Sequence, residues 1–186
     1  PLVSSPVTIT NLEVWVTNKT GSTSNVRNIL GFQDLGENPN QAHIENIGPS
    51  SEPINVPYPD NRNNELLPTD LAASSASIRD VSQITSLLNG SGYVQAVDYE
   101  KVENAKKLTS SEYSFNAQLG YISLNQALNS DEVLGVSFQY TINGIPYQVG
   151  EFSTDISSPD VLILKLLRST TLDVSLPMWR LLMKNV

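Results

Sequence analysis

The sequence predicts an α+β fold that is predominantly antiparallel β, with one or two short helices and a long irregular segment rich in proline. Three observations lead to this prediction. Apolar and polar residues alternate on both sides of Asn143-Gly144, one apolar stripe has helical spacing, and six of the eleven prolines fall within residues 36–68.

The best-defined element is a hairpin over residues 136–153. Asn143-Gly144 supplies the two positive-φ residues of a type I′ turn, and a two-residue loop fixes the register. The pairs predicted to face each other are Ile142/Ile145, Thr141/Pro146, Tyr140/Tyr147 and Phe138/Val149. The proline then lies in a non-hydrogen-bonded pair, where its missing N–H costs no bond to the partner strand.

Two strands are predicted near the start of the chain. Residues 7–17 are rich in β-branched residues, and a break in the alternation near Asn11 predicts a bulge. One face of this strand carries Leu12, Val14 and Val16, and the other carries Glu13 and Trp15. Residues 28–34 predict a shorter strand, which is expected to pair with the first as a long-looped antiparallel ribbon.

The middle of the chain predicts a helix over residues 77–89. Ser77 and Asp80 have the spacing of a capping box, and Gly90 is placed to end the helix. Its apolar stripe consists of Ile78, Val81, Ile84, Thr85 and Leu88. Residues 93–98 are predicted to form a strand, while the charges in residues 99–108 favour a short helix.

The remaining elements follow in chain order. Residues 113–115 and 120–124 predict two short strands, and residues 131–143 predict the strand that enters the hairpin. Residues 161–168 are apolar on both faces, which is typical of a covered strand. Residues 177–186 predict the start of a helix, or a connection to following strands.

The alternating pattern of the hairpin fits two environments, because a transmembrane barrel strand and a half-buried soluble strand share it. Most of the six or seven predicted strands are shorter than the roughly 9–11 residues that a transmembrane strand needs. The sequence therefore predicts that residues 1–186 form one soluble, non-barrel domain. Because the chain starts at Pro1 and stops within a helix-like pattern, we expect it to be part of a longer protein.

Composition excludes several classes of site. The net charge of −8 argues against nucleic-acid binding, which requires clustered Lys and Arg. The absence of cysteine excludes disulfides, cysteine-ligated zinc and a thiol nucleophile. The only histidine, His43, lies in the proline-rich segment, where a solvated loop residue is expected rather than a catalytic one.

The other candidate residues also favour structural roles. The carboxylate pairs are Asp34/Glu37, Asp98/Glu100 and Asp131/Glu132, and the last is predicted to be a solvated turn. Residues 60–65 (DNRNNE) miss the EF-hand pattern. Trp15 and Trp179 are expected in the core rather than in a stacking platform. We therefore predict no catalytic, cofactor-binding or metal-binding residue and no enzymatic activity.

Three stretches together resemble a known family. They are LEVWVTNKTGSTSNVRNILGFQDLGE, VENAKKLTSSEYSFNAQLGYISLNQALNSDEVLGVSFQYTINGIPYQVGEFS, and LILKLLRS with PMWRLLMKNV. They resemble the SprA or Sov family of giant outer-membrane translocons, which serve type IX secretion and gliding motility in Bacteroidetes. The resemblance covers most of the chain, and the proline-rich segment contributes least to it.

The resemblance implies a very large outer-membrane β-barrel that exports folded cargo. The implied partners of this barrel are a small barrel protein, a plug protein and the secreted cargo. The resemblance implies no catalytic residues and no cofactors. This chain would be a structural or interaction domain outside the membrane, on the periplasmic or extracellular side. The alternative from the residues alone is a free-standing β-rich adhesin or carbohydrate-binding module with an exposed aromatic patch.

Overall fold

The fold was analysed in a computed structural model that describes residues 7–33, 35, 75–175, 178–179 and 182. The proline-rich segment 36–68, with His43 and residues 60–65, lies outside the described residues. So do Asp34, Glu37 and most of the helix predicted after Pro177.

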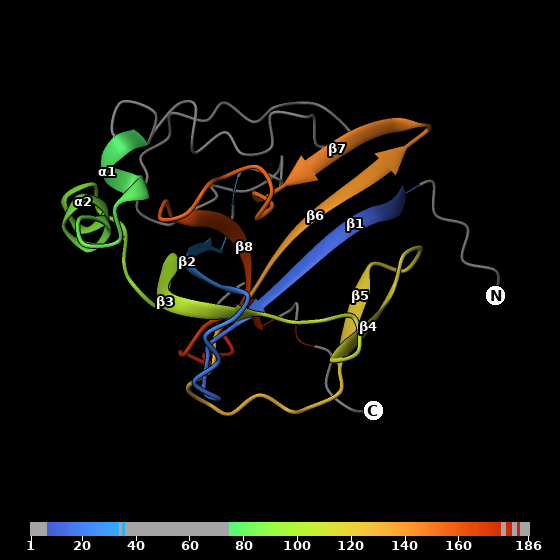
Figure 1. Ribbon diagram of the computed structural model, residues 1–186, viewed down its shortest axis with the longest axis horizontal. Helices are drawn as coiled ribbons and strands as arrows, with labels where there is room; N and C mark the ends of the chain where they lie inside the picture. Colours follow the sequence, from blue (N-terminus) through green and yellow to red (C-terminus); the bar gives the residue numbers. More distant parts are fainter. Residues whose placement is uncertain (1–6, 34, 36–74, 176–177, 180–181, 183–186) are drawn as a thin grey trace.

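The predicted fold class is confirmed: strands dominate, and the described helices are two short ones (Figure 1). The strands are β1 (Val7–Val16), β2 (Val26–Phe32), β3 (Tyr99–Lys107), β4 (Tyr113–Asn116), β5 (Tyr121–Leu124), β6 (Leu134–Ile142), β7 (Ile145–Val149) and β8 (Leu162–Arg168). The helices are α1 (Ser75–Arg79) and α2 (Ile84–Gly90).

Five of the strands form a closed ring. The main sheet has the order β1-β3-β2-β8-β6-β7, and β1 also pairs with β6 along most of its length. The pairing of β2 with β8 is parallel, and the other pairings in the ring are antiparallel. β7 pairs with β6 outside the ring and, with β6 and β1, forms the long ribbon in Figure 1.

The inside of the ring holds a tightly packed apolar core. Its core consists of Trp15, Ile29, Val102, Ala105, Leu162, Leu164 and Leu166 from four strands. Gly31 and Gly135 face these leucines, and an added Cβ would lie 2.9 Å from Leu166 Cδ1 at the first glycine and 3.3 Å from Leu164 Cδ1 at the second. Glycine at these positions therefore gives two leucines room inside the ring.

Two separate groups of elements cover the outside of the ring. α1 and α2 bury Ile78, Ile84 and Leu88 against Leu30, Phe32 and Ile163. The β4–β5 hairpin instead packs on β1 and β6, through Tyr113, Ile122 and Leu124. β8 is thus covered on both faces, as its apolar sequence predicts.

The hairpin prediction is confirmed in full. β6 and β7 pair as Ile142 with Ile145, Thr141 with Pro146, Tyr140 with Tyr147 and Phe138 with Val149. Asn143 and Gly144 both have positive φ, at 51° and 81°. The two paired tyrosine rings stack with centroids 5.4 Å apart.

The first strand and its bulge are also as predicted. The register of β1 against β6 shifts between Ile9 and Asn11, and the Asn11 carboxamide accepts a bond from the N–H of Leu12 at 2.9 Å. The Ile9 N–H donates to the carbonyl of Ala117, in the turn between β4 and β5. Because this bond points away from β6, it closes part of the outer edge of β1.

The predicted ribbon between the first two strands is wrong. β3 lies between β1 and β2 in the sheet, so these two strands do not pair with each other. The strand between them comes from much later in the chain, and a local sequence pattern cannot show such a long-range pairing.

Where residues 99–108 were predicted to form a short helix, the chain forms the strand β3 (Tyr99–Lys107). Val102 and Ala105 both enter the ring because Asn104, with φ of 51°, shifts the register between them. The Asn28 carboxamide accepts a bond from the Asn104 N–H and stabilises this shift. The bulge gives an apolar spacing of three, which imitates a helix in the sequence.

The single helix predicted over residues 77–89 is broken into α1 and α2. Asp80 does not cap Ser77; its carboxylate accepts bonds from the N–H and hydroxyl of Ser82 and the amide of Gln83. These local bonds hold a turn between the two helices. The predicted stripe survives, since Ile78, Ile84 and Leu88 are fully buried.

The strand predicted over residues 93–98 is a turn. The Asp98 carboxylate accepts the Val94 N–H at 2.7 Å, and the Asp98 N–H donates to the Val94 carbonyl. Ala96 has φ of 66°, which an extended strand does not allow.

Replacing Gly144 by valine is expected to lower the free energy of unfolding by about 1–2 kcal/mol, because a β-branched residue resists positive φ. Nothing lies within 4 Å of an added Cβ, so the cost comes from the backbone alone. Gly90→Val is the matched control, because its surroundings are equally open and its φ is not positive. Equal melting temperatures for the two variants would contradict the turn assignment.

Candidate functional site

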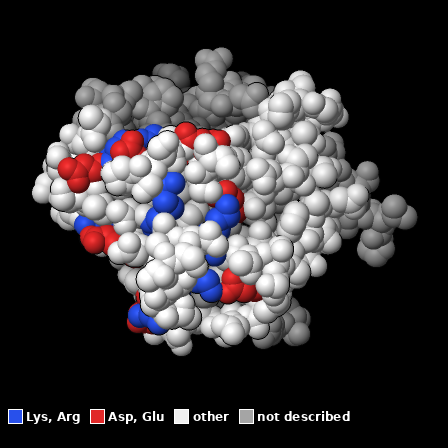
Figure 2. All heavy atoms as spheres, in the orientation of Figure 1, with Lys and Arg blue, Asp and Glu red and all other residues white. Residues whose placement is uncertain are grey.

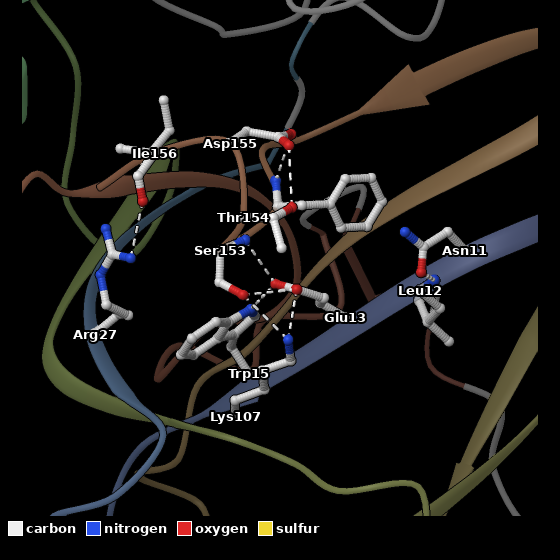
Figure 3. Close-up of polar contacts among 11 residues, drawn as sticks. Asn11, Leu12, Glu13, Trp15, Arg27, Lys107, Ser153, Thr154, Asp155 and Ile156 are labelled. Carbon is white, nitrogen blue, oxygen red and sulfur yellow. Dashed lines mark hydrogen bonds and ion pairs between the residues drawn. The ribbon is translucent and has the colours of Figure 1, made fainter. Parts of the chain in front are cut away.

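A highly connected polar cluster surrounds the carboxylate of Glu13 (Figure 3). Glu13 is buried, and Oε1 accepts bonds from Lys107 Nζ and from Ser153 Oγ at 2.7 Å. Oε2 accepts the Ser153 N–H at 3.0 Å and Trp15 Nε1–H at 3.3 Å. The cluster thus joins β1, β3 and the loop that follows β7.

The donors around Glu13 determine its charge state. Burial alone would raise the pKa of this carboxyl, but the bonds from Lys107 and Ser153 outweigh burial and lower the pKa below 4.5. Glu13 is therefore ionised at neutral pH. Its charge adds to the effect of burial in raising the pKa of Tyr113.

The cluster contains a serine and a lysine at a distance that invites a catalytic interpretation. Lys107 Nζ lies 3.1 Å from Ser153 Oγ. However, the hydroxyl donates to Glu13, a carboxylate with a lowered pKa and so a weak base. The ammonium of Lys107 is held by the same carboxylate. The arrangement is that of a structural ion pair with satisfied hydrogen bonds rather than an activated nucleophile.

A second buried carboxylate, Glu151, holds α1 to the ring. Arg79 donates to both of its oxygens at 2.6 Å, and the Ile163 N–H donates to Oε2 at 2.9 Å. The hydrogen bonds from Arg79 to Glu151 outweigh burial and raise the pKa of the guanidinium. Arg79 also donates to the Val161 carbonyl at 2.9 Å, so the end of α1 is attached directly to the start of β8.

Glu100 is a third buried carboxylate, and its bonds come from neutral donors. Its Oε1 accepts the Ser169 hydroxyl at 3.0 Å, and the Thr170 N–H and hydroxyl at 2.9 and 2.6 Å. Asp98, its predicted partner in a carboxylate pair, is buried too but binds the Val94 N–H. The two carboxylates therefore accept hydrogen bonds from separate segments of the chain and do not form a pair.

The pair Asp131/Glu132 is only partly as predicted. Asp131 is exposed and forms an ion pair with Lys19, which lowers its pKa. Glu132 is buried, which corrects the prediction of a solvated residue. Its carboxylate accepts the Asn129 N–H and so closes the turn that precedes β6.

Of the two tryptophans, Trp15 lies in the core as predicted. Trp15 is 1% exposed and Trp179 is partly buried, so Trp15 offers no ring for stacking. In the part of the chain that the structure describes, no three His, Asp or Glu side chains come together as metal ligands.

Sequence reasoning missed the structural roles of Glu13, Glu100 and Glu151. The available signal was their position in the sequence: Glu13 lies between Leu12 and Val14 in β1, and Glu151 follows β7 after a single glycine. Their long-range partners appear only in the folded structure: Ser153 for Glu13, Ser169 for Glu100 and Arg79 for Glu151 lie 140, 69 and 72 residues away along the chain.

Glu13→Gln is expected to lower the free energy of unfolding at pH 7 by about 2–3 kcal/mol, because it removes the charge that holds Lys107 and Ser153. The pKa of Glu13 is lower in the folded state, so its stabilisation is present above pH 4.5 and is lost as pH falls through the folded value. The variant should therefore lose less stability than the wild type between about pH 5 and 3.

Glu103→Gln is the control for this prediction, because its side chain is 59% exposed and contacts only Lys101 as an ion pair. Chemical denaturation followed across the pH range would measure both variants. Identical acid dependence of wild type and Glu13→Gln would show that Glu13 is not a stabilising carboxylate.

Comparison with known proteins identifies the family of this chain. Among the described residues, neither helix has the length and apolar content to cross a membrane. None of the curated proteins matches the chain. A family model described as a motility related/secretion protein matches residues 1–131, which is more than half of the chain. This chain therefore belongs to the SprA_N family of motility related/secretion proteins.

Proposed function

We propose that this chain is a structural and interaction domain of an outer-membrane channel that exports folded cargo in type IX secretion and gliding motility. The observation that carries the proposal is the family match over residues 1–131, together with the resemblance of the later hairpin and β8 sequences to the same translocons. Family membership supports motility and secretion, and the specific channel role is our inference.

The internal chemistry favours a scaffold over a catalyst. The carboxylates of Glu13, Glu100 and Glu151 are buried and bonded to groups of the same chain. Each one joins segments that are far apart in sequence. Such groups stabilise one arrangement of the ring and its covering elements, as a domain that presents a fixed surface requires.

The proposed partners follow from the channel role. They are the remainder of the parent β-barrel, a small outer-membrane barrel protein, a plug protein and the secreted cargo. We place the domain at the outer membrane but outside the bilayer.

The parent protein can be identified by fractionating source cells and probing with an antibody raised against this chain. The expected result is a band far larger than 20.3 kDa in the outer-membrane fraction, because the domain would be part of a giant channel. A band near 20.3 kDa in a soluble fraction would overturn the channel role.

The contribution of the domain to export can be measured with chromosomal variants. Glu13→Gln is expected to reduce both the cargo found in the medium and colony spreading, because it loosens the ring that presents the surface of the domain. Glu103→Gln should match the wild type, and samples are compared at equal abundance of the parent band. Normal export by a Glu13→Gln strain whose domain is protease-sensitive would contradict the proposal.

A further inference from the structure

Charged residues are missing from three segments of the chain. Residues 7–12, 113–130 and 133–150 contain no Asp, Glu, Lys or Arg, although the chain as a whole is 16% charged. Two of these segments are long, and a short acidic pair is all that separates them. We call the three segments together the uncharged end.

The fold brings the three segments to the same part of the molecule. β1 pairs with β6 from Val7 opposite Ile142, and β7 continues this ribbon. The β4–β5 hairpin packs on the outer faces of β1 and β6, and its turn accepts the Ile9 N–H. The start of β1, the β4–β5 hairpin and the β6–β7 turn lie on the right in Figure 1, whereas the charged side chains of Figure 2 gather on the left and in the centre.

The uncharged end exposes large apolar side chains. Phe115, Leu119 and Tyr121 at the tip of the β4–β5 hairpin are 44%, 51% and 39% exposed. Ile145, beside the β6–β7 turn, is 54% exposed. The exposed polar residues between them are uncharged and include Thr8, Thr10, Asn11, Ser114 and Ser123.

This composition favours a protein partner. The centres of protein interfaces are depleted in charge and enriched in aromatic residues, with hydroxyls and amides that pair across the contact. A lipid surface fits less well, because hydrocarbon would leave those amides and hydroxyls without partners and because the end has no cation for lipid phosphates. A charged protein face fits poorly too, since its charges would be desolvated without a counter-charge.

We propose that the uncharged end is a docking surface for a charge-free face of another domain of the same secretion protein. The identity of the partner rests on the proposed function; the chemistry of the contact rests on the uncharged end itself. The charged part of the domain, with its net negative balance, would remain in contact with solvent.

The chain contains no cysteine, so single thiols can report which surface is covered. Leu119→Cys and Ile145→Cys place a thiol on the uncharged end at exposed positions. Val94→Cys is the matched control, an apolar residue that is 44% exposed in the loop before β3. Each variant is labelled with N-ethylmaleimide in source cells that carry the full protein, and as the isolated chain, with the labelled peptide quantified by mass spectrometry.

The expected result is that the Leu119→Cys and Ile145→Cys thiols react at least about tenfold more slowly in the full protein than in the isolated chain, because a buried interface excludes the reagent. The Val94→Cys thiol should react at similar rates in both, which controls for access to the compartment. Equal rates at all three positions would overturn the proposal.

Two further measurements test whether another molecule covers the uncharged end. Protection in the isolated chain that grows with protein concentration would assign the surface to a second copy, and protection by phosphatidylcholine vesicles would assign it to lipid; either result overturns the proposal. The immunoblot reports the size of the parent and the thiol rates report the covered surface, so failure of one proposal can be distinguished from failure of the other.

Discussion

The closure of the ring depends on the junction between β1 and β3. Only two residue pairs join these strands, Trp15 with Lys107 and Val16 with Lys106. The buried carboxylate of Glu13 lies beside this junction and binds the lysine from β3, the indole of Trp15 and the loop after β7. An ion pair with complete hydrogen bonding thus reinforces the place where the backbone ladder is shortest.

The rest of the architecture follows from a closed ring. Closure directs one side chain in two inwards along each strand, which explains why Gly31 and Gly135 face Leu166 and Leu164. The opposite faces need separate covers, and the helices and the β4–β5 hairpin provide them. The family match ends at residue 131, but β6 and β8 complete the ring, so the folding unit extends past the matched region.

The parts of the fold that could be predicted are those fixed by residues close together in the sequence. The β6–β7 hairpin was predictable in full because Asn143-Gly144 fixes the turn and the turn fixes the register. The bulge of β1 was visible as a break in alternation near Asn11. In both cases the information lies within a few residues of the feature.

The errors came from features that depend on distant segments or on bulges. The charges of residues 99–108 predicted a helix where β3 lies, and the bulge at Asn104 removes the strand-like alternation between Val102 and Ala105. The insertion of β3 between β1 and β2 has no local signature. The predicted helix was interrupted because the side chain of Asp80 competes for nearby donors. The structural carboxylates escaped prediction because burial of a glutamate depends on partners that the sequence places far away.

The edges of the long ribbon bear on how the molecule avoids aggregation. A sheet edge with free backbone donors recruits strands from other chains. Here the Ile9 and Leu12 N–H groups of β1 are bonded to Ala117 and to Asn11, and β7 has proline at position 146, whose missing N–H would face outwards. The ribbon is therefore closed to strand addition at these positions. Recognition at this end must operate through side chains, so it can be selective without making the domain prone to form fibrils.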